Sequence, residues 1–284
     1  MTAPTPSIAD KRRTFRQLHE RGCFLIPNPW DIGSARMLQG LGFKALASTS
    51  SGFAWSQGRP DNAVPLDHVL AHLRALVEAT ELPVSADFEN GFAADAAGVA
   101  RNVQLAVETG VAGLSIEDAT GDAARPLFSI AESCERVRAA RRAIDATGGE
   151  VLLVGRAENF LFSDPDLAET IARLQAYAQA GADCLFAPGL REREHIAAVV
   201  AAVAPKPLNL LVGSASPLTL ADIAALGVRR VSIGGGLARA AWGGFLRAAR
   251  MLAEQGRFDG LADAASGREL NTFFSAQLAQ RPLP

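Results

Sequence analysis

Residues 84–92 read VSADFENGF, an apolar run that ends in two acids spaced two apart, Asp87 and Glu89. Side chains at positions i and i+2 of a β-strand point to the same face, so these two carboxylates project together if the strand continues through them. Two like charges that close repel each other unless a cation or a shared proton lies between them. The stretch therefore predicts a strand whose end bears an acidic site in need of a neutralising partner.

Seven more short apolar runs resemble the one that opens this stretch, and together they predict eight strands. The eight runs are residues 24–28, 45–49, 84–88, 113–118, 151–157, 184–188, 208–212 and 230–234. Most are separated by segments with helical spacing, such as 65–80, which has one apolar stripe. Continuous apolar runs are typical of strands buried on both faces, and strand–helix alternation indicates parallel pairing with right-handed crossovers.

Eight such units of about 30 residues predict an α/β fold, a (β/α)8 TIM-type barrel. The alternative is an open doubly wound sheet, which usually carries G-x-G-x-x-G after its first strand. Residues 26–35, IPNPWDIGSA, do not match that fingerprint. We expect a single barrel domain over about residues 20–250, with a C-terminal helical extension over about 251–284 that packs across a subunit interface.

The bulk composition excludes several classes of partner. The 284 residues include 28 basic and 30 acidic side chains, which give a formal net charge of −2 and no general attraction for nucleic acid or an anionic membrane. The three cysteines lie far apart without a CxxC motif, which fits a reducing compartment. The N-terminus lacks the apolar centre of a secretory signal, and no run of about 18 apolar residues occurs. We expect a soluble, cytoplasmic protein.

Polar residues gather where the predicted strands end, which is where barrels of this type place their active sites. Carboxylates follow three neighbouring strands, at Asp87 and Glu89, at Glu117, and at Glu158, and Arg156 lies beside them. Mg²⁺ prefers oxygen ligands, and an oxygen-rich set without sulfur suits it better than zinc. The sequence predicts a bound Mg²⁺ that neutralises these acids.

Simpler interpretations of the same residues stay open. Asp87 and Glu89 can belong to a helix N-cap after a strand, since Asp favours that position. Arg156 can pair with an acid for purely structural reasons. The serine-rich stretch 48–52 can be a turn.

The chain resembles the isocitrate lyase/phosphoenolpyruvate mutase family from about residue 20 to about residue 250. The resemblance rests on five segments in this order: TSSGF (49–53), GRPD (58–61), DFENG (87–91), IED (116–118) and GRAEN (155–159). It implies a (β/α)8 barrel, usually tetrameric, whose C-terminal helix is exchanged between neighbouring subunits. It also implies Mg²⁺ and enolate chemistry on a 2-oxo acid.

The resemblance also implies roles for individual residues. Ser51 and the backbone of Gly52 and Phe53 match the stretch that holds a substrate carboxylate. Asp87 matches the acid closest to the metal, and Glu89 and Glu117 match acids that bind it mostly through water.

Three residues are the expected catalytic set: Asp61, which matches a loop acid near the reacting end, Arg156, which matches an arginine that pairs with substrate oxygens, and Glu117. Asn209, in the seventh apolar run, is a further candidate for substrate binding.

Two family loops are missing. The cleaving lyases carry K-K-C-G-H after the fourth strand, where this chain reads EDATGDAARPLFSIAESCERV (117–137), with Cys134 inside an apparent helix. The mutases carry EDK and then K-x-N-S, but Ala119 replaces that lysine, and Ala187 and Pro188 stand near the position of a mutase histidine. These departures argue against isocitrate-type cleavage and against phosphoryl migration.

The remaining core predicts a Mg²⁺-dependent C–C lyase or decarboxylase that acts on a small 2-oxo acid such as oxaloacetate through an enolate. Decarboxylation needs an electron sink and then a proton donor, whereas retro-aldol cleavage needs a base, and no His or Cys stands in a matching position. The alternatives are a P–C bond enzyme of the mutase type and a non-catalytic member that binds a dicarboxylate. We expect a homo-oligomer, a dimer or tetramer, with the substrate choice left open by loop 119–132.

Overall fold

The structure, a computed structural model, describes residues 5–162 and 166–280. The chain divides into two compact units, one up to Gly235 and one from Gly236 onward. The sequence analysis expected the C-terminal extension to begin at about residue 251, a position inside the long helix that opens the second unit. The two units are described separately below.

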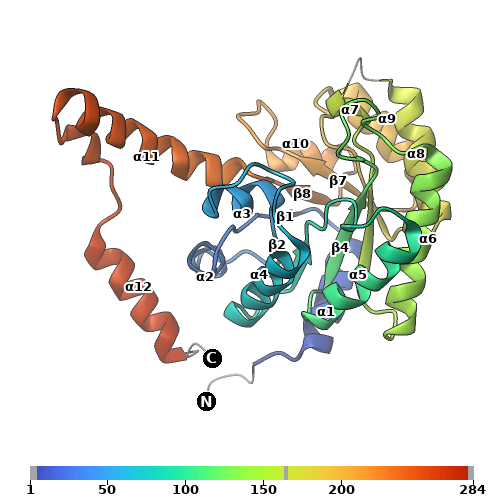
Figure 1. Ribbon diagram of the computed structural model, residues 1–284, viewed down its shortest axis with the longest axis horizontal. Coiled ribbons are helices and arrows are strands. Elements are labelled where there is room, and N and C mark those ends of the chain that lie inside the picture. The colour runs from blue at the N-terminus through green and yellow to red at the C-terminus, as the bar shows by residue number, and fades with distance from the viewer. Residues whose placement is uncertain (1–4, 163–165, 281–284) are drawn as a thin grey trace. The chain divides into compact units, whose positions relative to one another are not determined.

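The first unit contains eight parallel strands that form a nearly closed barrel, which confirms the predicted (β/α)8 fold (Figure 1). Their order in the sheet is β1-β8-β7-β6-β5-β4-β3-β2. The Ala47 N–H donates to the Pro27 carbonyl at 3.1 Å and links the two edges. The strands are Phe24–Ile26 (β1), Leu46–Ala47 (β2), Val84–Ala86 (β3), Gly113–Glu117 (β4), Leu152–Arg156 (β5), Cys184–Phe186 (β6), Leu208–Leu211 (β7) and Arg230–Ser232 (β8). Each ends one or two residues before its predicted limit.

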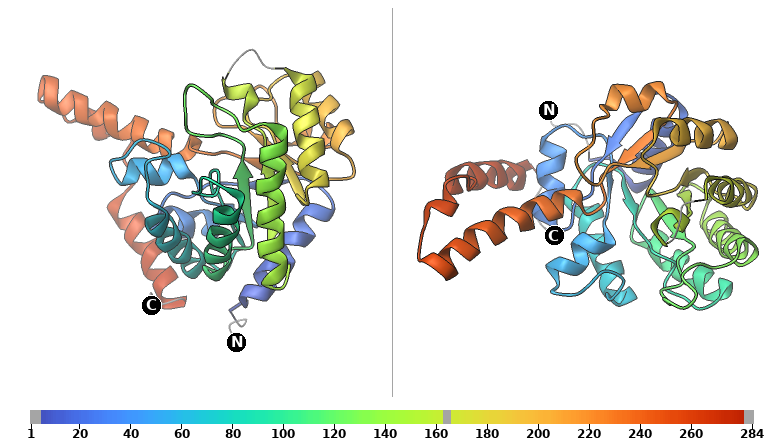
Figure 2. Two further views of the ribbon diagram at one scale, coloured as in Figure 1. Left: turned by 45° about the vertical axis from the view of Figure 1, so that its right-hand side comes forward. Right: turned by 90° about the horizontal axis from the view of Figure 1, so that it is seen from above.

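The helices lie around the outside of the strands (Figure 2). They are Ile8–Glu20 (α1), Ile32–Gly40 (α2), Ser50–Ser56 (α3), Leu66–Ala79 (α4), Ala96–Glu108 (α5), Ile130–Ala146 (α6), Asn159–Phe162 (α7), Leu167–Gln179 (α8), Arg193–Val203 (α9) and Leu220–Ala225 (α10). Ser7, Ser129 and Thr219 begin three of them with capping boxes. Because their starts are fixed in this way, the helices hold the strand-end loops at defined positions.

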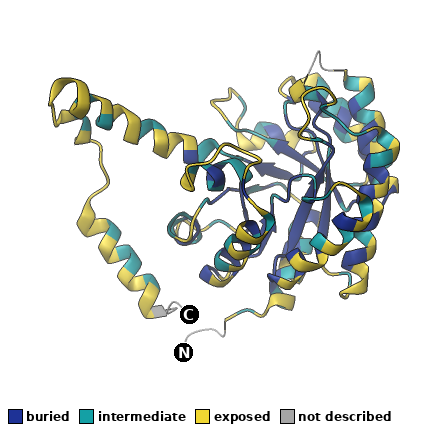
Figure 3. Ribbon diagram, in the orientation of Figure 1, coloured by how far each residue is buried: buried dark blue, intermediate teal, exposed yellow. Residues whose placement is uncertain are grey.

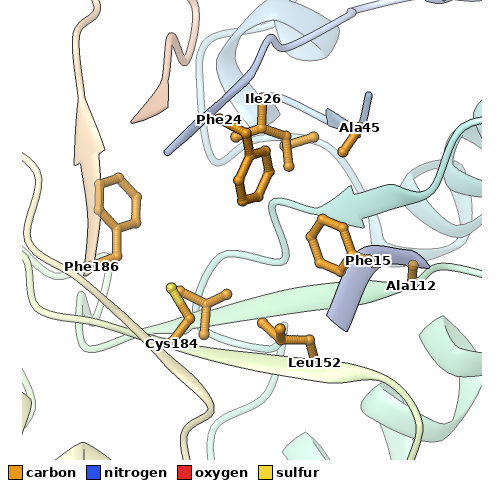
Figure 4. Packing of buried hydrophobic residues seen from close by; sticks show 10 residues of the cluster. Phe15, Phe24, Ile26, Ala45, Ala112, Leu152, Cys184 and Phe186 are labelled. Carbon is orange, nitrogen blue, oxygen red and sulfur yellow. The ribbon is translucent and has the colours of Figure 1, made fainter. Parts of the chain in front are cut away.

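The interior of the barrel is apolar at its N-terminal end, where α1 closes it. Phe15 of α1 is fully buried and packs in one cluster with Phe24, Leu152 and Cys184 (Figure 4). A Cβ at Gly113 would lie 2.6 Å from the Phe15 ring, so glycine is required there. This apolar cluster fills the N-terminal end of the barrel, so the polar residues lie toward the opposite, C-terminal end.

The second unit consists of the helix Gly236–Gln255 (α11), the short 3-10 helix Asp259–Leu261 (η1) and the helix Gly267–Gln280 (α12). Much of this unit is coloured as exposed in Figure 3. Its exposed large apolar residues include Trp242, Phe245 and Phe258. Within the described residues, no helix is both long and apolar enough to cross a bilayer. Exchange of the last helices between subunits stays a prediction.

His19, at the end of α1, should make stability depend on pH. Its Nδ1 lies 2.8 Å from the Phe15 carbonyl oxygen, and its ring packs edge-on against Phe15 and Phe24. Burial lowers the pKa of His19 from 6.5 to about 3. The unfolded chain therefore takes up a proton below about pH 6.5 that the folded chain refuses, so stability is lost as pH falls.

We expect this group to remove about 2 kcal/mol from the free energy of unfolding between pH 7 and pH 5. The measurement is urea unfolding of the native protein and of His19→Leu, in which the pH slope should be smaller by that amount. His68→Gln, on the exposed part of α4, is the control and should keep the native slope. Equal slopes in the native protein and His19→Leu would contradict the prediction.

Candidate active site

A polar cavity of about 150 Å³ opens at the C-terminal ends of the strands. Its lining combines residues inside the barrel with residues of the loops that follow the strands. The lining residues are Asn28, Ala47, Ser48, Thr49, Ser50, Ser51, Asp61, Ser85, Ala86, Asp87, Ser115, Arg156, Phe186, Leu211, Arg230, Ser232, Gly234 and Gly235. Charged groups of both signs face this cavity, so it suits a small polar ligand.

Arg156, at the end of β5, lies at the centre of the acidic residues. Its Nη1 is 3.1 Å from Asp87 Oδ1 and 3.0 Å from Glu117 Oε2, and its Nε donates to Glu158 Oε1. Its guanidinium also lies over the Phe186 ring, 5.1 Å from the ring centre. Three carboxylates share one guanidinium, so two negative charges remain in excess if all three are ionised. Burial, opposed by Arg156, raises the pKa of Glu117 and of Glu158.

The two acids of VSADFENGF come together by a different route from the one expected. Strand β3 ends at Ala86, so the strand does not continue through Asp87 and Glu89, and Glu89 has a φ of 46°. Burial and the charges of Asp87 and Asp61 raise the pKa of Glu89 to about 8. Arg136 of α6 donates to the Asn90 carbonyl at 2.6 Å and fixes this turn. The sequence analysis expected strand alternation to bring Asp87 and Glu89 together. In the structure, the loop after β3, which Arg136 of α6 holds, does so.

Asp87 is held by the start of α3. The Ser50 N–H donates to Asp87 Oδ2 at 3.0 Å, and the Asp87 N–H donates to Ser48 Oγ at 2.9 Å. Asp61 lies on the rim of the same cavity, where burial and the Asp87 charge raise the pKa of Asp61. The charge of Asp87 is therefore near enough to influence the ionisation of Asp61.

The predicted carboxylate-binding stretch forms the first turn of α3, with Thr49 as its N-cap. Ser51 lines the cavity, and its Oγ is 3.1 Å from Thr49 Oγ1. The Gly52 N–H points to Thr49 Oγ1 at 3.3 Å, and the Phe53 N–H donates to the Thr49 carbonyl at 3.0 Å. In this structure both backbone groups are used within the helix turn, and Ser51 is the member of the stretch that faces the cavity.

A small hollow of about 10 Å³, large enough for about one water, lies beside the main cavity and is lined by Asp87, Glu89, Phe53 and His72. His72 stacks on Phe53, with ring centres 3.8 Å apart and planes at 8°. Burial lowers the pKa of His72 to about 4. His72 is thus a neutral side chain that lines the hollow. The sequence analysis treated α4 only as an amphipathic helix and did not identify His72 as a site residue.

Asn209 lies deeper than predicted and contacts other side chains of the barrel interior. It is fully buried on β7, where its Nδ2 donates to Ser232 Oγ at 2.9 Å and its Oδ1 accepts from Arg230 Nε at 2.9 Å. Its substrate role stays a prediction, but the structure shows it as a support for Arg230, which does line the cavity. Arg230 was missed as a site residue, although a charged residue at the start of a buried strand was a visible signal.

Serine was a second signal that sequence reasoning did not use. Strands β3, β4 and β8 each carry one serine, Ser85, Ser115 and Ser232, and all three line the cavity. Apolar, branched side chains usually fill the interior of such a barrel. Small hydroxyl residues in their place open a polar space there.

A buried network fixes the loop after β4. Asp118 accepts from Tyr177 Oη at 2.5 Å and from Arg173 Nη1 at 3.0 Å, and its other oxygen accepts the Glu158 N–H at 2.8 Å. The same Arg173 nitrogen donates to the Phe128 carbonyl at 2.9 Å. The network connects the acid cluster at β5 to Phe128 in the loop 119–132, which the sequence analysis linked to the choice of substrate.

The predicted Mg²⁺ ligands have suitable chemistry. Asp87, Glu89 and Glu117 are hard oxygen donors, and their excess negative charge would be offset by a divalent cation. In this structure Arg156 bridges Asp87 and Glu117, and within residues 5–162 and 166–280 no three acid, His or Cys side chains are arranged as a ready-made metal site. The donor set fits Mg²⁺ in type and in charge.

A parallel (β/α)8 barrel with a small cavity of carboxylates and arginines at the strand ends defines, as a class, a barrel enzyme for small polar substrates. The sequence profile of the phosphoenolpyruvate phosphomutase family matches residues 15–253. The chain therefore belongs to the isocitrate lyase/phosphoenolpyruvate mutase family, as the sequence motifs predicted. Its role is that of an enzyme of this lyase-type superfamily.

Individual relatives agree with this placement. A candidate lyase/mutase from Burkholderia cenocepacia J2315 has a structure with a TM-score of 0.91 and 49% identity, covering 94% of this chain and 97% of that one. An oxaloacetate decarboxylase from Bradyrhizobium sp. (strain ORS 278) is 32% identical over 260 residues, 89% of this chain and 85% of the relative. The structure of an oxaloacetate acetylhydrolase in complex with the product oxalate has a TM-score of 0.83 and 28% identity, covering 96% of each chain.

Removing the central cation of the cluster should be far more costly than removing a surface arginine. Arg156→Met leaves Asp87, Glu117 and Glu158 without their shared partner, which should lower the free energy of unfolding by about 3–5 kcal/mol. Urea unfolding at about pH 8, where the carboxylates are most ionised, measures the loss.

Arg125→Met is the control for that experiment. Arg125 pairs with Glu132 at 2.6 Å, but 56% of its side chain is exposed, so its loss should cost less than about 1 kcal/mol. Similar losses for the two variants would show that the acid cluster does not depend on Arg156.

Proposed function

We propose that the protein is a Mg²⁺-dependent carbon–carbon lyase or decarboxylase that acts on a small 2-oxo acid of the oxaloacetate type. The observation that carries the proposal is the guanidinium of Arg156, which faces the cavity while three carboxylates hold it in place. The names of two relatives, an oxaloacetate decarboxylase and an oxaloacetate acetylhydrolase, support the choice of substrate class.

The size of the cavity supports a small substrate. Its volume of about 150 Å³ is below the roughly 300–1,000 Å³ of sites for drug-sized ligands. A four-carbon 2-oxo acid carries oxygen atoms along its whole length, and the cavity offers hydroxyl groups and two arginines to meet them.

Arg156 supplies the fixed positive charge that the chemistry needs. Breaking the C3–C4 bond of an oxaloacetate-like acid leaves an electron pair that is spread over an enolate, so negative charge grows on the 2-oxo oxygen. A preorganised cation beside that oxygen favours the transition state over the ground state. Within the described residues, no hydrogen bond uses Arg156 Nη2, so that donor is available to a substrate oxygen.

Asp87, Glu89 and Glu117 are the residues that would hold Mg²⁺. When bound, the ion supplies Lewis-acid polarisation of the 2-oxo group and neutralises the excess acid charge. Asp87 is oriented for this role by Ser48 and by the Ser50 N–H.

Asp61 is the proposed proton donor. Its carboxyl lies on the rim of the cavity, and its raised pKa keeps a proton on it more readily than on an ordinary aspartate. Transfer of that proton to the enolate carbon would complete decarboxylation.

The loop after β4 supports this assignment over isocitrate-type cleavage. Cys134 is buried within α6, and burial raises the pKa of its thiol, so it does not resemble a reactive acid/base thiol. The absence of lysine from residues 119–132 favours a second candidate function, a family member that binds a dicarboxylate without turning it over.

The proposal extends to location and assembly. We infer a cytoplasmic enzyme, since Cys23, Cys134 and Cys184 are all free thiols. We also infer a homo-oligomer, because Trp242 and Phe245 of α11 are 39% and 59% exposed and would be covered by another copy. Light scattering after size exclusion should give a dimer or tetramer mass.

Turnover of oxaloacetate should depend on Mg²⁺ and on Asp87. NMR of purified protein with oxaloacetate should show pyruvate as the product of decarboxylation, or oxalate and acetate as the products of hydrolysis. EDTA should stop the reaction and added Mg²⁺ should restore it. Asp87→Asn should lower kcat/KM at least 100-fold, which corresponds to about 3 kcal/mol of transition-state stabilisation.

Asp67→Asn is the control, because Asp67 is an exposed acid in the first turn of α4, and it should keep native turnover. A protein that binds oxaloacetate but releases no product under any of these conditions would be the non-catalytic member instead.

Asp61→Asn should separate proton donation from binding. It removes the proton but keeps the shape, so kcat should fall about 10²–10⁴-fold while KM changes little. The measurement is initial-rate kinetics with oxaloacetate at saturating Mg²⁺. A change in KM alone would assign Asp61 to binding.

A further inference from the structure

Arg230 is a second arginine of the cavity, and unlike Arg156 it forms no ion pair among the described residues, although the charge of Asp87 is near enough to interact with it. It opens β8, it is 4% exposed, and it lines the cavity together with Ser232 of the same strand. Arg156, by contrast, is shared among three carboxylates. Both arginines line the same cavity, but carboxylates pair with Arg156 and form no ion pair with Arg230 among the described residues.

The contacts of Arg230 leave much of its guanidinium unused. Its Nε donates to Asn209 Oδ1 at 2.9 Å, and Asn209 is in turn fixed by its bond to Ser232. Its Nη1 is buried and has no hydrogen-bond partner within the described residues. No carboxylate within residues 5–162 and 166–280 forms an ion pair with it. Asn209 therefore orients the guanidinium group of Arg230 without neutralising its charge.

A buried, unneutralised cation is unfavourable unless something compensates it. Burial lowers the pKa of Arg230, but an arginine side chain keeps its proton in proteins, so the charge is not lost in this way. Burying such a charge without a partner costs several kcal/mol, and an unsatisfied donor adds to that cost. A protein keeps such a group where an anion from solution can pair with it, and the guanidinium fork matches a carboxylate in shape.

We propose that Arg230 binds a carboxylate of the substrate, so that the enzyme selects linear dicarboxylates over monocarboxylates of the same length. This inference rests on the proposed function, because it concerns the same cavity. Asp61 and Asp87 also line the cavity, and the Asp87 charge interacts with Arg230, but Asp87 is already paired with Arg156, so Arg230 is the arginine of the cavity that is left to attract a substrate carboxylate. A four-carbon diacid would place one end near Arg156 and the acid cluster and its other carboxylate on Arg230.

A purely structural role for Arg230 makes a different prediction. If Arg230 only holds Asn209, its replacement would lower the melting temperature but would affect every ligand alike. If it binds a carboxylate, its replacement would remove the preference for the diacid and leave the monoacid unaffected.

The test uses succinate and butyrate, which share four carbons and are not turned over, in calorimetric titrations with excess Mg²⁺. The native protein should bind succinate at least tenfold more tightly than butyrate. Arg230→Met should weaken succinate binding about 10–100-fold, the usual range for a lost charged hydrogen bond, with butyrate unchanged. Arg229→Met is the control, since Arg229 precedes Arg230 but donates to the Gly22 carbonyl at 3.2 Å, and it should behave like the native protein.

The native preference is measured without any variant, so a misfolded Arg230→Met does not leave the proposal untested. Equal affinity of the native protein for succinate and butyrate would overturn it, as would an equal loss of both ligands in a folded Arg230→Met. A clear preference for succinate with no turnover of oxaloacetate would uphold the role of Arg230 and reject the decarboxylase. Turnover of oxaloacetate without a preference for succinate would uphold the decarboxylase and reject the role of Arg230.

Discussion

The site depends on one electrostatic arrangement, a single guanidinium shared by three carboxylates. Arg156 brings Asp87, Glu117 and Glu158 together from the ends of three adjacent strands, which without it would repel one another. The arrangement still has too much negative charge, and this excess explains why burial can raise the pKa of Glu117 and Glu158. A bound cation would offset this excess negative charge, and the guanidinium of Arg156 is the fixed group that would face a growing anionic charge on a substrate.

The barrel supports this arrangement by separating its apolar and polar ends. Phe15 and its neighbours fill one end, and a ring of serines and two arginines fills the other. Because the apolar end is already filled, the polar residues cannot pack into it. Two helices complete the support, since the start of α3 fixes Asp87 and Arg136 of α6 fixes the turn that carries Glu89.

Much of the architecture could be predicted because its signals are local. The eight strands follow from apolar runs and the barrel from their alternation with helices, and the acids were found because carboxylates after buried strands are conspicuous. Long-range side-chain contacts carried no such signal. The sequence does not show that Glu89 turns through a positive φ, that His72 stacks on Phe53, or that Asn209 serves Arg230. Each depends on residues from separate elements that only the folded chain brings together.

The loop after β4 is fastened at both of its ends. At one end Asn90 donates to the Ala119 carbonyl at 3.1 Å, and at the other Arg173 holds the Phe128 carbonyl. The intervening turn is exposed and makes its hydrogen bonds largely within itself, through Thr120 and Asp122. Such a segment can exchange its residues during evolution without disturbing the carboxylates beneath it. Proteins with this fold can thus change their chemistry through substitutions in this loop, between the two points that hydrogen bonds hold in place.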